Sequence, residues 1–181
     1  MEPEIKPFIL ILDGPMGSGK TTASKILNEK LEGTARVALA DVKRFISGFE
    51  KDHAYNKISQ EVIIVMTEEY IKRGISVIVE WAMRKERAET LKAIADKYNA
   101  RFFMYQLDAP KELLIQRVKD RTKLMLNKPE LSEKNLENIH ENFETNYAFH
   151  VEHRHTGANV LNSEKLSSEQ IVEKIIKEIE K

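Results

Sequence analysis

Hydrophobic and polar positions along the chain follow two different periods, and their order predicts the fold. Short unbroken apolar runs are typical of strands that are buried on both faces of a parallel sheet. Apolar residues that recur every three or four positions mark one face of a helix. The runs that predict strands are residues 8–12, 37–40, 75–79, 102–107 and 159–161. The stripes that predict helices span residues 23–31, 58–71, 88–98, 136–147 and 171–179, and a further helix is expected from Pro110 to about Arg121, with Asp108 as its N-cap.

This alternation of strands and helices predicts an α/β fold in one domain over residues 1–181. Strands joined by helical crossovers align in parallel, and the crossover helices cover both faces of the sheet. The segment 122–149 lies between the fourth and fifth strands, and Pro129 and Ser132 interrupt it. We expect a short lid loop there, followed by a helix. Near the C-terminus, Ser167 and Gln170 have the spacing of a capping box that begins the last helix.

The most specific motif follows the first predicted strand. Residues 14–22 match G-x-x-x-x-G-K-T, the P-loop that surrounds phosphates with backbone N–H groups. Lys20 supplies a cation for the β- and γ-phosphates, and the Thr21 hydroxyl is a hard oxygen ligand suited to Mg²⁺. A glycine-rich turn with an unrelated lysine is the alternative, but the strand before the motif and the helix after it favour a P-loop. The expected nucleotide-binding residues are Gly14, Pro15, Met16, Gly17, Ser18, Gly19, Lys20, Thr21 and Thr22.

Charged and polar residues also follow the other predicted strands. Ligands of parallel α/β sheets bind beyond the carboxyl ends of the strands, so these residues are expected to share one rim. They are Asp41, Lys43 and Arg44 after strand two, Glu80 and Arg84 after strand three, Arg117 and Arg121 on the helix after strand four, and Asn162 after strand five. A carboxylate, several cations and a P-loop together suit phosphoryl transfer.

Each of these residues also has a structural interpretation. Asp41 is our candidate for the general base, although a helix N-cap would also place an aspartate there. Arg121 is expected to bind phosphate, and Arg117 either does the same or pairs with an acidic neighbour. Glu80 either holds Mg²⁺ through water or orients Arg84 or Lys20.

Taken together, these segments resemble the P-loop kinases of the nucleoside-monophosphate-kinase-like group. The most similar branch includes zeta toxins, polynucleotide 5′-hydroxyl kinases, gluconate and shikimate kinases and chloramphenicol phosphotransferase. The P-loop is the specific part of the resemblance, and residues 40–45, 77–87, 114–121 and 160–163 are looser matches. The resemblance implies a three-layer α/β/α sandwich with strand order 2-3-1-4-5, a lid whose arginines close over Mg·ATP, Asp41 as the residue that deprotonates the acceptor, and a loop at Asn162 that packs on adenine. The chain differs from the branch in having a single acidic residue at strand two and Glu80 where aspartate is usual, and it lacks the acceptor motif of adenylate kinases.

The amino-acid composition narrows the range of expected binding partners. The chain has 29 basic and 29 acidic residues and no cysteine. A neutral total disfavours extended nucleic acid or a membrane surface as a partner, and the absence of cysteine fits a reducing cytoplasm. Residues 127–130 only superficially resemble the guanine-reading N-K-x-D motif, because a helix and not a strand is predicted before them. The histidines at 140, 150, 153 and 155 are interpreted as surface or packing residues.

Three functions are compatible with the sequence. The preferred one is an ATP-dependent kinase that transfers the γ-phosphoryl to a hydroxyl or phosphate of a small-molecule or nucleotide acceptor. Lys20, Asp41 and Arg121 would then be catalytic, and Lys43, Arg44, Glu80 and Arg84 would bind the acceptor. The alternatives are a kinase for nucleic-acid 5′-hydroxyls and a nucleotide-binding switch without transfer activity. The acceptor and the oligomeric state stay open.

Overall fold

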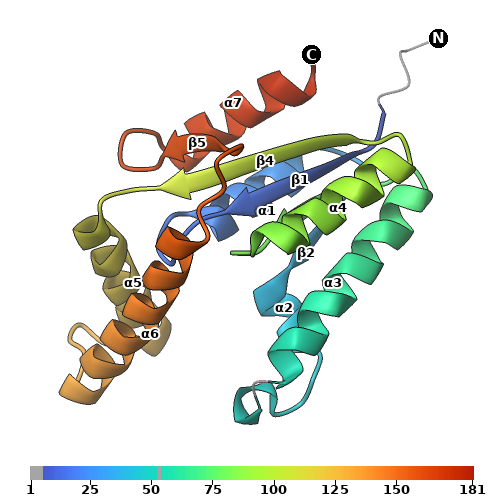
Figure 1. Ribbon diagram of the computed structural model, residues 1–181. Helices are drawn as coiled ribbons and strands as arrows, with labels where there is room; N and C mark the ends of the chain where they lie inside the picture. The colour runs from blue at the N-terminus through green and yellow to red at the C-terminus, as the bar shows by residue number, and fades with distance from the viewer. Residues whose placement is uncertain (1–5, 53) are drawn as a thin grey trace.

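The computed structural model describes residues 6–52 and 54–181, built around five parallel strands in the order β2-β3-β1-β4-β5 (Figure 1). This is the strand order that the resemblance implied, so the expected fold class is confirmed. Strand β1 pairs with β3 on one side and with β4 on the other, and Ile11 lies opposite both Val79 and Met104. The strands are β1 (Phe8–Asp13), β2 (Thr34–Ala38), β3 (Ser76–Glu80), β4 (Arg101–Asp108) and β5 (Asn159–Asn162).

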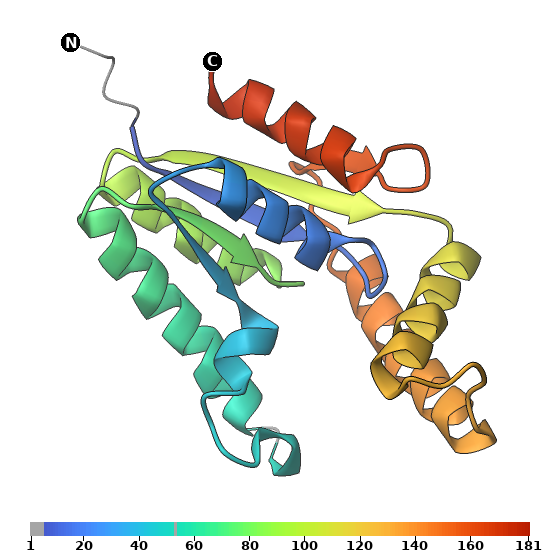
Figure 2. The same ribbon diagram turned by 180° about the vertical axis from the view of Figure 1, so that it is seen from behind.

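Helices cover both faces of this sheet, as the continuous apolar strands predict. Alternate residues of β1 face opposite layers: Ile9 and Ile11 pack in the cluster of α3 and α4, whereas Leu10 and Leu12 pack in the cluster of α1 and α7. The two layers can be followed in Figures 1 and 2, where α1 lies behind the sheet and then in front of it. The helices of these layers are α1 (Lys20–Lys30), α3 (Ala54–Lys72), α4 (Lys85–Lys97) and α7 (Ser168–Ile179).

Two helical arms project beyond the carboxyl ends of the strands, one on each side of β1 (Figure 1). One arm is the hairpin of α5 (Lys111–Leu126) and α6 (Glu133–Glu152), which has its own apolar cluster around Leu114, Ile139 and Phe143. The other arm is formed by α2 (Leu39–Lys43), a 3-10 turn (Phe49–Lys51) and the beginning of α3. The P-loop lies between the two arms. None of the helices in residues 6–52 and 54–181 is long and apolar enough to cross a membrane.

Three predicted boundaries are wrong by a few residues. Strand β2 ends at Ala38, and Asp41 lies within α2 rather than directly at a strand end. Asp108 does not cap α5, because it continues β4 by pairing with Asn162, and Pro110 is the N-cap residue instead. The helix also extends past Arg121 to Leu126.

The lid loop is consequently short, spanning residues 127–132. Asn127 ends α5 in a left-handed conformation (φ 50°), which asparagine adopts more readily than most residues. Ser132 begins α6, since its side chain accepts a hydrogen bond from the backbone N–H of Asn135. The predicted capping box of Ser167 and Gln170 is confirmed at the beginning of α7.

Candidate functional site

The loop between β1 and α1 has the backbone geometry of a P-loop. Gly14, Gly17 and Gly19 all have positive φ angles, at 138°, 81° and 95°. A Cβ at Gly14 would lie 2.2 Å from the carbonyl oxygen of Leu107, and a Cβ at Gly17 would lie 2.4 Å from that of Leu114. At Gly19, in contrast, no atom lies within 4 Å of the Cβ position. The loop is therefore packed tightly against β4 and α5 on one side and opens to free space where α1 begins.

Lys20 folds back over this loop. Its Nζ donates hydrogen bonds to the carbonyl oxygens of Gly14 (2.7 Å) and Pro15 (2.9 Å). Burial lowers the pKa of Lys20 below its usual 10.5, and the carboxylates of Asp13 and Glu80 oppose that shift. A cation that has lost part of its hydration binds an incoming phosphate strongly, because less water has to be displaced.

A cavity of about 590 Å³ lies beside the loop. Residues 16–22 form one wall, Arg117 and Arg121 from α5 contribute cations, and Glu80 contributes a carboxylate. The far wall consists of Ser163, Leu166 and the first turn of α7, including Ile171. This volume is typical of small-molecule sites. Backbone N–H groups and cations at one end and apolar side chains at the other fit the phosphates and base of a nucleoside triphosphate.

The two arginines of α5 have different surroundings. Arg117 donates hydrogen bonds to the hydroxyl (3.0 Å) and the carbonyl oxygen (2.8 Å) of Ser163. Arg121 is exposed and makes no hydrogen bond or ion pair with any residue that the structure describes. Arg121 is thus the one whose guanidinium is available to a ligand, and Arg117 anchors the loop after β5.

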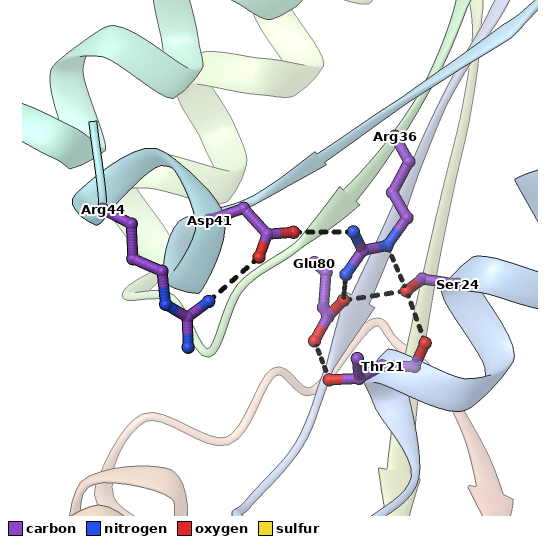
Figure 3. Close-up of polar contacts among 6 residues, drawn as sticks. All are labelled: Thr21, Ser24, Arg36, Asp41, Arg44 and Glu80. Atoms are coloured by element: carbon purple, nitrogen blue, oxygen red, sulfur yellow. Dashed lines mark hydrogen bonds and ion pairs between the residues drawn. The ribbon is translucent and has the colours of Figure 1, made fainter.

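Glu80 faces α1 (Figure 3). Its Oε1 accepts a hydrogen bond from the Thr21 hydroxyl, and its Oε2 accepts one from Ser24 Oγ at 2.8 Å. A carboxylate and a hydroxyl are the hard oxygen groups that Mg²⁺ prefers, and Mg²⁺ usually takes few protein ligands beside phosphates and water. The described residues include no cluster of three or more acidic, histidine or cysteine side chains that could hold a metal alone. Thr21 and Glu80 are therefore the residues that fit a nucleotide-bound Mg²⁺, and Glu80 contacts neither Arg84 nor Lys20 through a hydrogen bond.

Asp41 lies on the other side of Glu80 and is linked to it by Arg36 (Figure 3). Arg36 Nη1 donates to Asp41 Oδ2 at 2.7 Å, and Arg36 Nη2 donates to Glu80 Oε2 at 2.5 Å. Arg44 Nη1 donates to the second carboxylate oxygen of Asp41, Oδ1, at 3.1 Å. The structure therefore brings together the predicted residues Thr21, Glu80, Asp41 and Arg44.

Other predicted residues lie apart from this group. Lys43 borders a separate hollow of about 210 Å³ with Asp52 and neighbouring residues, and burial lowers the pKa of Lys43. Arg84 is the N-cap residue of α4, and its guanidinium lies 5.8 Å from the ring centre of Phe149 in α6. Asn162 is absent from the lining of the nucleotide cavity, because its Oδ1 accepts the backbone N–H groups of the next turn. Ser163 and Leu166 of the same loop line the cavity instead.

Sequence reasoning missed three polar residues of the site. Arg36 precedes an apolar run and belongs to no recognisable motif. A charged residue inside a parallel strand is nevertheless unusual, and this could have marked Arg36 as a candidate. Asp13 ends β1 with 2% exposure and accepts a hydrogen bond from Gln106 Nε2 at 2.9 Å. Asn146 on α6 accepts the backbone N–H of Met16 at 2.7 Å and so joins the α5–α6 hairpin to the P-loop. No sequence pattern pointed to this long-range contact.

Comparison with known proteins agrees with this geometry. The chain is similar in structure to the APS kinase of Mycobacterium tuberculosis in complex with AMPPNP and APS (15% identity, 97% of this chain and 99% of that chain, TM-score 0.69). It is also similar to a gluconokinase from Sinorhizobium meliloti (12% identity, 96% and 92%, TM-score 0.64) and to the tunicamycin resistance protein of Deinococcus radiodurans (15% identity, 96% and 96%, TM-score 0.59). At these identities the likeness shows the fold alone. No curated protein matches the chain. A family model described as AAA domain matches residues 9–146, more than half of the chain. The protein therefore belongs to the AAA domain family, and its fold is that of the small P-loop kinases.

Proposed function

We propose that this protein is an ATP-dependent kinase that transfers the γ-phosphoryl of Mg·ATP to a hydroxyl group of a small-molecule or nucleotide acceptor. The observation that carries the proposal is the position of Asp41. Its side chain is 50% exposed, yet a single guanidinium connects it to Glu80, which is 8% exposed and bonded to the P-loop threonine. A solvent-accessible carboxylate next to a buried metal-side carboxylate is what a base and a donor site require.

In the proposed reaction the acceptor hydroxyl oxygen attacks the γ-phosphorus, and the bond from that phosphorus to the β–γ bridging oxygen breaks. Asp41 takes the hydroxyl proton, and ADP leaves with the electron pair of the broken bond. Lys20 and Arg121 neutralise charge on the transferred group. Mg²⁺, when bound at Thr21 and Glu80, would supply further charge neutralisation on the phosphates. Arg44, which binds Asp41, lies on the acceptor side, and the small-kinase neighbours support the same reaction class.

The test is transfer of label from [γ-³²P]ATP to panels of sugars, nucleosides, nucleotides and 5′-hydroxyl oligonucleotides. We expect a labelled small-molecule or nucleotide product that requires Mg²⁺. Asp41→Asn should lower its formation by at least roughly 100-fold, the usual contribution of a general base. The ADP affinity of Asp41→Asn at saturating Mg²⁺ should stay within about threefold of the wild type, because Asp41 acts in proton transfer and not in binding the nucleotide.

Asp96→Asn is the matched control. Asp96 is an exposed aspartate of α4 whose side chain pairs with Lys92, and its replacement should leave transfer unchanged. Label found only on oligonucleotides would replace the proposal with a nucleic-acid 5′-hydroxyl kinase. Tight nucleotide binding without label in any panel, and with Asp41→Asn silent, would replace it with a nucleotide-binding switch.

A further inference from the structure

We propose that Arg36 is a positioning residue that holds the acceptor-side carboxylate Asp41 and the metal-side carboxylate Glu80 as one unit, and that it leaves Asp41 Oδ1 as the oxygen that takes the acceptor proton. This inference rests on the proposed function, because it assigns a role to Asp41 as the base. It extends that function by naming the atom and the residue that orients it.

The backbone explains how Arg36 reaches both carboxylates. In the parallel pairing of β2 with β3, Arg36 lies opposite Ile78 and Ala38 lies opposite Glu80. Residues two apart on a strand leave the same face, so Arg36 and Glu80 both point toward α1. The chain then turns from β2 into α2, and this turn returns Asp41 to the guanidinium of Arg36 (Figure 3).

The guanidinium of Arg36 uses all three of its nitrogens. Nε donates to Ser24 Oγ at 2.8 Å, Nη1 to Asp41 Oδ2 and Nη2 to Glu80 Oε2. These acceptors belong to α1, α2 and the end of β3, so one rigid planar group sets the relative positions of three elements. A lysine at this position would carry the charge but present a single flexible ammonium, which cannot reproduce a planar fork.

The two arginines that bind Asp41 differ in how far their side chains are buried. The Arg36 side chain is 14% exposed, whereas that of Arg44 is 63% exposed. Exposed ion pairs contribute little and exchange easily, but the guanidinium of Arg36 is also held by Ser24 and Glu80, so it stays in place to bind Asp41. Oδ2 therefore stays with Arg36. Oδ1 becomes available when Arg44 moves, and the acceptor hydroxyl then occupies the position of the Arg44 guanidinium.

The same contacts connect Asp41 to the Mg²⁺ site. The positive charge of Arg36 next to Glu80 weakens the attraction of that carboxylate for Mg²⁺. Replacing Arg36 by an apolar residue should therefore tighten Mg²⁺ binding while it slows transfer. A merely structural role predicts the opposite for Mg²⁺, because a disordered site would bind the ion more weakly.

The experiment compares Arg36→Met and Arg36→Lys with the control Arg73→Met, which removes an arginine of similar chemistry directly after α3 that is 61% exposed and pairs with Glu69. For each variant we would measure the Mg²⁺ concentration that half-saturates binding of a fluorescent ADP analogue, and kcat and KM for the acceptor that the labelling screen returns. Arg36→Met should lower the half-saturating Mg²⁺ about threefold or more through loss of one nearby like charge. Its kcat should fall roughly 100-fold with KM for the acceptor almost unchanged, the pattern of a lost transition-state arrangement. Arg36→Lys should recover the Mg²⁺ requirement of the wild type but little of kcat, and Arg73→Met should match the wild type in both.

One part of the experiment needs no acceptor, because it measures only the Mg²⁺ requirement of ADP binding. Because Asp41 touches Glu80 only through Arg36 among the described residues, Asp41→Asn should raise the half-saturating Mg²⁺ in the wild-type background, where Arg36 is then left to Glu80 alone. It should have no such effect in Arg36→Met. Any of three results would overturn the inference. They are an equal effect of Asp41→Asn on the half-saturating Mg²⁺ in both backgrounds, a higher Mg²⁺ requirement in Arg36→Met, and full kcat in Arg36→Lys. Failure of the wild type to label any acceptor would instead count against the proposed function. The Mg²⁺ measurements would still show whether Arg36 couples Asp41 to Glu80.

Discussion

Arg117 and Arg121 lie one helical turn apart on α5 and both line the nucleotide cavity, yet they should respond to substitution in opposite ways. Arg117 is committed to Ser163, whereas the guanidinium of Arg121 has no partner among the residues that the structure describes. We therefore predict that Arg117→Met mainly lowers stability and that Arg121→Met mainly lowers turnover.

The magnitudes follow from the contacts. Arg117 makes two charge-assisted hydrogen bonds to Ser163, a residue that is 7% exposed. Bonds to charged groups contribute about 1.5–3 kcal/mol each, and sharing one guanidinium makes the pair worth less than the sum, so we expect a loss of about 2–4 kcal/mol. In a chain of this length 1 kcal/mol corresponds to roughly 2–4 °C in Tm, which gives a decrease of about 4–16 °C. Arg121→Met should change Tm by less than about 2 °C, as an exposed substitution does, but should lower kcat by roughly 100-fold or more if it acts as arginines do on a transferred phosphoryl group.

Thermal unfolding and urea unfolding without nucleotide measure the first effect, and ATP turnover at saturating Mg²⁺ measures the second. Each variant is the control for the other, because the same side chain is truncated on the same helix. A Tm for Arg117→Met equal to that of the wild type would refute the assignment of Arg117 as an anchor. A loss of stability in Arg121→Met as large as in Arg117→Met would refute the assignment of Arg121 as a free ligand group.

Three further predictions concern the loop, the lid helix and the last helix. Gly17→Ala would place a Cβ 2.4 Å from the carbonyl oxygen of Leu114 at a φ of 81°, so we expect a loss of Tm and of ADP binding by calorimetry; unchanged binding would show that the loop adapts. Burial lowers the pKa of His150 below 6.5 against the opposing charge of Asp13, so the folded state favours the neutral ring. The stability that this contributes is complete above the ordinary pKa and is lost as the pH falls through 6.5 toward the lowered value, and His150→Gln should make that decline of Tm with pH shallower. Ser167→Ala removes the capping box of α7 and should lower unfolding stability by about 1 kcal/mol in urea titrations, with the m-value unchanged.

Much of the fold was predictable because its determinants are local. A strand buried on both faces must be apolar at every position, so β1 and β3 are evident as unbroken runs. Boundaries were harder because they depend on pairing partners. Asp108 has the local character of an N-cap, but its pairing with Asn162 across the sheet keeps it in β4. Nothing within ten residues of Asp108 contains that information.

The candidate site also has one part that local sequence determines and one part that depends on tertiary contacts. The donor half is a continuous segment whose glycines and Lys20 perform their roles within a few residues of one another, so the sequence predicts it well. The proposed acceptor half is assembled from β2, α2 and the end of β3. Asp41 was found from its position after a predicted strand, but Arg36 depends on the register that places Ala38 opposite Glu80, and register is a tertiary property.

Polar side chains connect both arms to the P-loop. The arm of α2 and α3 reaches Thr21 through Arg36 and Glu80, and the α5–α6 hairpin reaches the backbone of Met16 through Asn146. Because both contacts end on the loop that would bind the phosphates, we expect the position of each arm to be coupled to the occupancy of the loop. A nucleotide that reorganises the P-loop therefore acts on acceptor-side groups that it does not touch. The carboxylate of the proposed base is held in place from the donor side through Arg36, so in the proposed reaction the bound nucleotide would affect the geometry in which Asp41 meets the acceptor.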